Sequence, residues 1–260
     1  MEKMSQRLAK KSVNAILAAL EIYNKPDCKY REESFCILMI NGFELLFKAK
    51  ILSDNSEKIN SLYVYENKKG KKDKILKQKI IKRNRTYTID INRCMNLLLS
   101  QGGITNNIKE NIDILIEIRD NAIHLLNNSN NLKQKIYSIC VASIKNYVKL
   151  FENWFPKVGI QNYNFFITPL NFDIALKNYD TVNLSVAENN FINYIELASN
   201  LASENDEFDI LLNVDLKISR NNINEALLIE YANNGKKINV ELNDETFKKC
   251  THLHISSLLK

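Results

Sequence analysis

Glycine and proline are rare in this chain, and their scarcity is the strongest constraint on its fold. The 260 residues include only six glycines and three prolines. Because these two residues supply most tight turns and helix breaks, their scarcity favours long helices over many short strands. Hydrophobic residues make up 45% of the chain and charged residues 25%, which is ordinary for a globular protein with a genuine core. We therefore predict a mainly α-helical protein.

Apolar residues recur at helical spacing through the first part of the chain. The periodicity predicts helices over residues 5–24, 31–52, 90–101, 105–126 and 132–154. Pro26 and Pro156 follow the first and last of these segments, and Gly102–Gly103 fits the end of the third. Thr105 fits an N-cap for the fourth. We expect residues 1–155 to form one helical bundle.

A narrow polar stripe lies within the most apolar of these segments, residues 31–52. Asn41, Glu44 and Lys48 recur at three- and four-residue spacing on an otherwise buried helix. Buried polar groups are costly unless they are satisfied. The stripe is therefore expected either to pack against another helix or to lie beside a functional site as its supporting shell.

Residues 61–88 interrupt the helical pattern and carry most of the positive charge. The whole chain has 36 Lys and Arg against 30 Asp and Glu, a net charge of +6. Residues 62–65 are typical of a strand, 69–71 of a turn, and 75–81 of a returning strand or helix, so we expect a basic β-hairpin insert. The insert is either a solvated loop or, with nearby tyrosines, an RNA-binding element. Its candidate RNA-binding residues are Lys68, Lys69, Lys71, Lys72, Lys74, Lys77, Lys79, Lys82, Arg83 and Arg85.

The pattern changes after Pro156, and we predict a smaller α+β domain over residues 156–260. A helix is expected over residues 186–202. Apolar residues alternate over 208–218, as in a half-buried strand. Further strands are predicted at 164–169, 227–231 and 238–242, the last two around an Asn-Gly hairpin turn. The chain stops abruptly at Lys260, so the sequence leaves open a further segment after it.

Cysteine usage and hydropathy indicate a soluble cytoplasmic protein. The five cysteines are odd in number, include no CxxC pair and lie mostly among apolar residues, as reduced buried thiols do. No signal peptide is evident, and the most apolar run, residues 35–47, is too short to span a bilayer. His252 and His254 lack the thiols or carboxylates that would complete a metal site. We expect no metal, no cofactor and no membrane association.

The strongest candidate for chemistry is the run Arg119-Asp120-Asn121-Ala122-Ile123-His124 in the fourth predicted helix. Arginine offers phosphate a permanent planar fork of donors, and histidine exchanges a proton near neutral pH. Five residues correspond to about 140° around a helix, so Arg119 and His124 are not direct neighbours. Asp120 and His124 share a face, and Asn121 adds a polar group on the same side. The alternatives are an Arg119 salt bridge to Glu117, Asp113 or a neighbouring helix, and a structural His124 hydrogen-bonded to Asp120.

This run, near the end of a long helix in a small bundle, resembles the HEPN superfamily. The early segments, residues 11–26 and 30–49, are similar to an uncharacterised bacterial HEPN-like family. The resemblance covers residues 1–155 and extends more faintly over the C-terminal part. It implies a helical bundle that dimerises, with the two motif helices facing each other across a cleft.

The same resemblance implies metal-independent RNA cleavage in phage defence, toxin–antitoxin or stress systems. It implies that His124 is the general acid or base and that Arg119 binds the scissile phosphate, with Asp120 and Asn121 as positioning groups. The expected partners are RNA (tRNA or mRNA), a second copy of the chain, and an antitoxin or regulatory protein. The competing hypothesis is a non-catalytic RNA- or partner-binding HEPN-like module.

Overall fold

The computed structural model describes most of the helical part of the chain and parts of the remainder. The described residues are 2–25, 28, 30–67, 74–76, 78–79, 85–120, 130–160, 186–202, 206–212, 214–216, 229–233 and 236–240. For residues 65–86, 130, 131 and those after 212, only the backbone is described. The chain divides into two compact units, residues 1–170 with 181–211, and residues 171–180 with 212–260.

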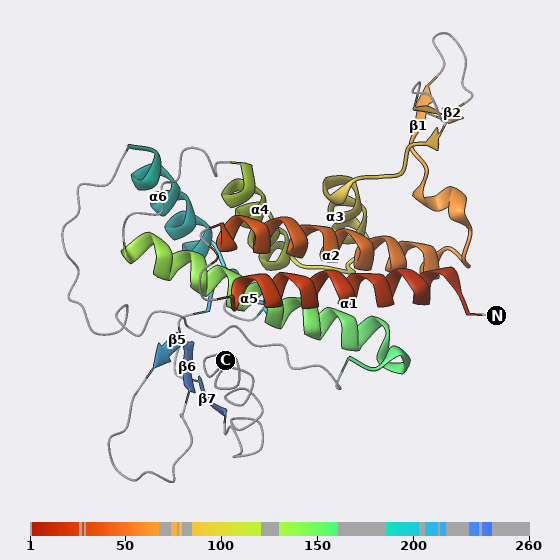
Figure 1. Cartoon of the computed structure of the whole chain (residues 1–260). Coiled ribbons are helices and arrows are strands. Elements are labelled where there is room, and N and C mark those ends of the chain that lie inside the picture. Colours follow the sequence, from red (N-terminus) through yellow and green to blue (C-terminus); the bar gives the residue numbers. More distant parts are fainter. Residues whose placement is uncertain are drawn as a thin grey trace, which may run out of the picture. The chain divides into compact units, whose positions relative to one another are not determined.

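The protein is mainly helical, as the scarcity of glycine and proline predicts. Its helices are α1 (Met4–Tyr23), α2 (Arg31–Asp54), α3 (Ile91–Ser100), α4 (Asn106–Asp120), α5 (Asn130–Trp154) and α6 (Val186–Asn200), all of them in the first unit. Short 3₁₀ turns occupy Ile59–Leu62 and Pro156–Val158. Helices α1 and α2 lie side by side as a long antiparallel pair (Figure 1), and α2 also contacts α3, α4 and α5. Helix α2 is therefore central, as its apolar sequence predicts.

Local signals explain where α3 and α4 start and stop. The side chain of Asp90 accepts a hydrogen bond from the backbone N–H of Arg93, at 2.9 Å, and caps the start of α3. Gly102 adopts φ +69°, and the N–H of Gly103 donates to the carbonyl oxygen of Leu98 at 2.8 Å, which closes the helix. Thr105 precedes α4 as predicted. Its hydroxyl, however, has no hydrogen-bond partner among the described residues, so it does not act as the expected cap.

The core is rich in aromatic side chains from α2 and α5. Phe43 and Phe47 of α2 are fully buried, as are Tyr147 and Phe151 of α5. The Tyr147 ring meets Phe43 edge to face, with centroids 5.7 Å apart, a favourable aromatic geometry. Its hydroxyl lies 2.7 Å from Ser12 Oγ of α1. Because Ser12 donates its only hydroxyl hydrogen to the Ala9 carbonyl, Tyr147 is the donor in this bond, which joins α1 to α5.

Among the described residues, β structure is confined to short antiparallel strands and one isolated antiparallel bridge between Tyr63 and Thr88. In the first unit β1 (Tyr65–Asn67) pairs with β2 (Lys74–Leu76), and β3 (Gln78–Lys79) with β4 (Arg85–Thr86). In the second unit β5 (Val214–Leu216), β6 (Ile229–Asn233) and β7 (Lys236–Val240) follow one another in a three-stranded sheet. These fragments do not establish the predicted β-hairpin insert or α+β domain, whereas the predicted helical class is confirmed.

The helical unit extends beyond the boundary expected after residue 155. Helix α6 and residues 206–211, which we call the strap, belong to this first unit. Phe208 and Ile210 of the strap are buried and the residues between and after them less so, so the predicted half-buried alternation is present. No strand is assigned at 206–211, however, because the strap packs against helices rather than against a sheet. The strand predicted at 164–169 lies outside the described residues.

The close approach of α1 and α2 at Gly42 generates a stability prediction. A Cβ atom at Gly42 would lie 2.3 Å from Cδ1 of the fully buried Ile16 and 3.0 Å from its Cγ1. Overpacking costs about 1–3 kcal/mol, whereas alanine gains about 1 kcal/mol of helix propensity over glycine. Gly42→Ala should therefore lower the free energy of unfolding by about 1 kcal/mol in urea denaturation.

Ile16→Val supplies the matched background because it removes the atom that clashes. In that background Gly42→Ala should be neutral or stabilising, since the propensity gain then outweighs a smaller clash. An equal effect of Gly42→Ala in both backgrounds would show that Gly42 is not kept small by Ile16.

Candidate functional site

Arg119 and Asp120 form the last described residues of α4, where they make an ion pair. Arg119 Nε donates to Asp120 Oδ1 at 2.7 Å, and the two side chains are 35% and 56% exposed. This is a different partner from Glu117 or Asp113, the acidic residues of the same helix considered above. The guanidinium group is thus held at the end of the helix with part of its surface open to solvent.

The pair changes the titration of both groups. The hydrogen bond to Asp120 raises the pKa of Arg119, and the same bond lowers the pKa of Asp120. Both groups are therefore charged at neutral pH. The Asp120 carboxylate partly offsets the charge of the guanidinium group. It also holds that group in one orientation, so a phosphate bound here would contact an arginine that is already oriented.

His124 and Asn121 lie outside the described residues, as do all of residues 121–129. The predicted helix to about residue 126 is therefore described only as far as Asp120. How His124 is placed relative to Arg119, and whether it shares a face with Asp120, stays a prediction.

A buried layer of thiols and phenols lies close to Arg119. The charge of Arg119 interacts with Cys36 of α2, and Cys36 is hydrogen-bonded to Cys140 of α5. Burial, followed by contact with Cys36, raises the pKa of the Cys140 thiol well above its usual range. Burial likewise raises the pKa of the nearby Tyr23. The Cys140 thiol and the Tyr23 phenol are therefore neutral at physiological pH, and the charge of Glu32 also acts on both of them.

The α2 polar stripe lies elsewhere. Glu44 and Lys48 form an ion pair at 2.6 Å, and Lys48 Nζ also donates to Thr88 Oγ1 at 3.2 Å. Asn41 is exposed. Lys48 follows Cys36 by twelve residues, or about 18 Å along the helix, so the pair is remote from the level of Arg119. Lys48 thus fastens α2 to the segment that returns from the insert, and a role for the stripe beside a functional site stays a prediction.

The base of the insert is held by backbone hydrogen bonds. The N–H of Val64 donates to the Tyr87 carbonyl and that of Ile89 to the Leu62 carbonyl, each at 2.9 Å. The ten basic side chains predicted to bind RNA lie between these positions and outside the side chains that the structure describes. Their arrangement therefore stays a prediction.

One face of α4 is acidic, and Tyr194 of α6 lies close to it. Burial and then the charges of Glu110, Asp113 and Glu117 raise the pKa of Tyr194 of α6 to about 12. Helix α6 is also joined to α5, by the ion pair of its Glu196 with Lys135 at 3.1 Å. Because this face carries three carboxylates, a phosphate backbone is not expected to bind there.

Three buried asparagines are functional candidates that the sequence did not reveal. Asn107 and Asn111 of α4 and Asn146 of α5 are 5%, 0% and 1% exposed. All three hydrogen-bond to the backbone of the strap. Asparagine is abundant throughout this chain, so only the long-range contacts distinguish these three from the rest. In the sequence, only the four-residue spacing of Asn107 and Asn111 on one helix indicated a shared face.

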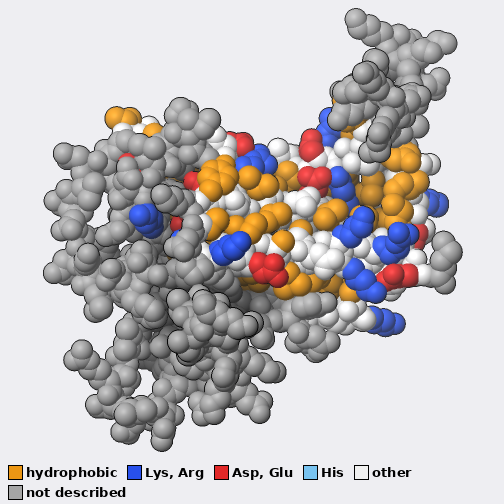
Figure 2. Space-filling model, in the orientation of Figure 1, with side chains coloured by type: hydrophobic (Ala, Val, Ile, Leu, Met, Phe, Trp, Pro, Cys, Tyr) orange, Lys and Arg blue, Asp and Glu red, His pale blue; other side chains and the backbone are white. Residues whose placement is uncertain are grey.

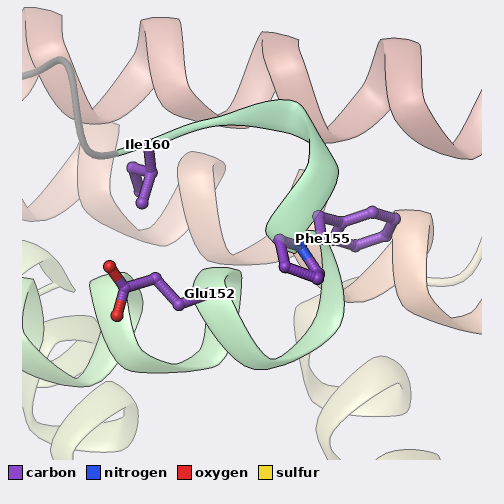
Figure 3. A pocket seen from close by; sticks show the side chains of 4 residues that line it. Glu152, Phe155 and Ile160 are labelled. Atoms are coloured by element: carbon purple, nitrogen blue, oxygen red, sulfur yellow. The ribbon is translucent and has the colours of Figure 1, made fainter.

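Other features offer less for chemistry. A hollow of about 210 Å³ at the end of α5 is lined by Glu152, Phe155, Pro156 and Ile160 (Figure 3), a single carboxylate among apolar groups. No cluster of three or more His, Cys, Asp or Glu side chains suited to a metal ion occurs among the described residues. Within that same part of the chain, no helix has both the length and the apolar character needed to cross a membrane.

The predicted burial is confirmed for three of the four cysteines that the structure describes. Cys28, Cys36, Cys94 and Cys140 are free thiols, and the last three are buried. Burial raises the pKa of Cys94 to about 12. Cys250, His252 and His254 lie outside the described residues.

Comparison with known proteins identifies a family but no activity. Residues 7–205 match the model of a family described as a domain of unknown function, DUF3644. The match covers most of the chain, and the protein belongs to this family. No curated protein matches it, and neither does any solved structure.

The Arg119–Asp120 pair generates a titration prediction. Arg119→Gln removes the hydrogen bond that favours the ionised carboxylate, so the pKa of Asp120 should rise towards the ordinary Asp value of about 3.9. Because the folded-state pKa of Asp120 is lowered, its small stabilising effect is present above the ordinary value and is lost as pH falls through the lowered one. NMR titration of the side-chain carboxyl carbon measures the shift.

Lys109→Gln is the control, since Lys109 is on α4 but pairs with Asp113. It should leave the Asp120 titration unchanged. If Arg119→Gln also left that titration unchanged, the pair would not hold in solution.

Proposed function

We propose that this protein is a metal-independent endoribonuclease of HEPN type that acts as a homodimer in phage defence, toxin–antitoxin or stress systems. The observation that carries the proposal is Arg119, a partly exposed cation fixed by Asp120 at the end of α4. The segment that carries His124 follows it directly, before α5 starts at Asn130. The helical unit and the resemblance of this run to HEPN motifs support the same function.

Arg119 is suited to hold the scissile phosphate without losing Asp120. The carboxylate accepts from Nε, and a guanidinium group has five N–H donors. The terminal nitrogens can therefore bind a phosphate oxygen while Asp120 keeps the plane of the group fixed. Charge that develops on the phosphate during the reaction would be stabilised by these preorganised donors.

His124 supplies the proton transfers in the proposed reaction. It accepts the proton of the ribose 2′-hydroxyl while the 2′-oxygen bonds to phosphorus and the bond to the 5′-oxygen breaks. The leaving 5′-oxygen takes a proton from a protonated imidazole, supplied by the second copy of the chain. The products are a 2′,3′-cyclic phosphate, which hydrolyses to a 3′-phosphate, and a 5′-hydroxyl. Asn121 positions His124 and the RNA.

A dimer would bring the two residue types together. Arg119 and His124 are about 140° apart on an ideal helix, so opposed helices from two chains would complete each other's sites. Figure 2 shows hydrophobic side chains exposed along the face formed by α1 and α2. Ile37, next to Cys36 at the level of Arg119, is 43% exposed and is the kind of residue that an interface covers.

In this proposal the insert and the second unit bind the substrate and partner proteins. We infer that residues 61–88 form the basic β-hairpin insert and that its ten Lys and Arg residues hold RNA by charge, without sequence selection. Residues 212–260 would belong to a smaller α+β domain that recognises RNA or a regulatory protein. The antiparallel pair β1–β2 and the three-stranded sheet of β5, β6 and β7 support this organisation. The proposed site of action is the cytoplasm.

A non-catalytic RNA- or partner-binding module is the second candidate. The ion pair itself favours it, because an arginine held by the next residue also serves as a structural helix end. In this alternative the basic insert and the dimer are retained, and RNA is bound without being cut.

Cleavage of total cellular RNA in the presence of EDTA tests the proposal. His124→Ala should lower the cleavage rate about 10²–10⁴-fold, the usual contribution of an acid–base group. Arg119→Ala should lower it about 10²–10³-fold, as loss of an oxyanion-binding donor does. End analysis should find cyclic or 3′-phosphates and 5′-hydroxyls.

Lys109→Ala is the matched control because it removes another cation of α4. It should cleave at the wild-type rate. Equal products from wild type, His124→Ala and Arg119→Ala would contradict the catalytic assignment, and RNA binding without any cleavage would favour the second candidate. Loss of cleavage on addition of EDTA alone would indicate a metal-dependent reaction.

RNA binding at several salt concentrations tests the insert. Changing Lys69, Lys71, Lys72 and Lys74 to Gln should weaken binding of single-stranded RNA. It should also flatten the slope of log K against log salt by up to about 0.7 for each lysine that no longer neutralises a phosphate. The control changes Lys11, Lys25, Lys58 and Lys157, which are exposed lysines of the helical unit with the same total charge. Equal weakening in both variants would mean that net charge alone, rather than the insert, binds RNA.

A further inference from the structure

The strap, residues 206–211, crosses helices α4 and α5 in a way that resembles a bound peptide. Phe208 and Ile210 are 4% and 3% exposed, while Asp209 between them is only half-buried. An extended segment with alternating burial would normally lie in a sheet, where neighbouring strands satisfy its backbone. Here helical side chains take that role.

Three asparagine side chains hydrogen-bond to the backbone of three successive strap residues. Asn107 Nδ2 donates to the Phe208 carbonyl at 2.9 Å, and Asn111 Nδ2 donates to the Ile210 carbonyl at 2.7 Å. Between these two residues, Asn146 binds both the N–H and the carbonyl of Asp209. The Asn146 amide donates to the Asp209 carbonyl at 2.7 Å and accepts from its N–H at 3.1 Å. This double contact is the one a neighbouring β-strand would make.

The asparagines are also braced against one another. Asn146 Nδ2 lies 3.4 Å from Asn111 Oδ1, and Asn111 Nδ2 lies 3.3 Å from the Ile139 carbonyl of α5. Buried amides without partners cost about 1–3 kcal/mol each, and apolar residues would pack this surface without that cost. We call the surface of α4 and α5 that carries these three asparagines the groove. Its amides are satisfied by a segment that offers backbone N–H and carbonyl groups.

Side-chain contacts add selectivity to this backbone recognition. Lys145 pairs with Asp209, and Lys149 pairs with Glu207 at 2.9 Å. Lys149 also lies over the Phe208 ring, 5.3 Å from its centroid. The occupant thus has the pattern acidic, aromatic, acidic, aliphatic over residues 207–210, and its first three side chains contact two lysines of α5.

We propose that the groove between α4 and α5 is a binding site for an extended peptide of this pattern, and that the strap is its ligand within the same chain. A partner protein that presents an acidic and apolar extended segment would compete with the strap for the three asparagines. The proposal is independent of RNA cleavage, since it uses neither Arg119 nor His124.

The test uses the whole chain in a variant whose strap binds the groove more weakly. Phe208→Ala removes the buried ring from the strap and leaves the groove unchanged. A fluorescein-labelled peptide of sequence Asp-Glu-Phe-Asp-Ile-Leu, matching residues 206–211, should bind this variant saturably in fluorescence anisotropy. It should bind the wild type at least about tenfold more weakly, because the covalently attached strap competes at high effective concentration.

Two controls examine the backbone contacts. The same peptide N-methylated at the residue matching Asp209 keeps every side chain but lacks the N–H that Asn146 accepts, and should bind about five- to tenfold more weakly. Asn146→Leu in the Phe208→Ala background keeps the approximate shape of the side chain and should abolish binding.

Circular dichroism and thermal unfolding establish that the variants are folded. If Phe208→Ala does not fold, Asp209→Lys serves instead, since it places a like charge opposite Lys145. A folded variant that fails to bind the peptide would overturn the proposal and make the strap a fixed part of the helical unit. Equal binding of the N-methylated and unmodified peptides would overturn it as well.

Discussion

The close approach of α1 and α2 at Gly42 is the constraint on which the rest of the helical unit depends. Without a side chain at that position, Ile16 of α1 enters the space beside α2, and the two longest N-terminal helices pack over most of their length. Helix α5 then closes the core through its aromatic residues and the bond of Tyr147 to Ser12. Helices α3 and α4 pack on the same central α2. The surfaces that carry Arg119 and the asparagines are fixed by this arrangement.

The helical unit places its charged and polar groups in separate regions. Arg119 and Asp120 lie at the end of α4, where the charge of Arg119 interacts with the buried Cys36. The pair Glu44 and Lys48 lies farther along α2 and fastens the base of the insert. The asparagines lie between α4 and α5. Helix α4 carries both Arg119, at the proposed phosphate-binding end, and two of the asparagines of the proposed peptide groove. The two proposed sites use different side chains.

The sequence pattern of the strap predicts its burial correctly but not the helices against which it packs. Alternation of apolar residues after 208 predicts a half-buried extended segment, and Phe208 and Ile210 are indeed buried. The pattern does not specify what satisfies the backbone. Asn111 and Asn146 belong to segments predicted as helices for their apolar stripes, and their amides face an element far away in the sequence. This also explains why the helical unit extends past the boundary expected at Pro156.

The sequence by itself determined the helical class, the approximate ends of α1, α2, α3, α5 and α6, the start of α4, and the buried state of Cys36, Cys94 and Cys140. These features depend on the spacing of residues close together in the chain and on local signals such as Asp90 and Gly102. Only the tertiary structure decided that Gly42 makes room for Ile16, that Lys48 meets Thr88, and that three asparagines bind the strap. Such pairings depend on which surfaces meet in space, and a residue's type and spacing do not encode its distant partner.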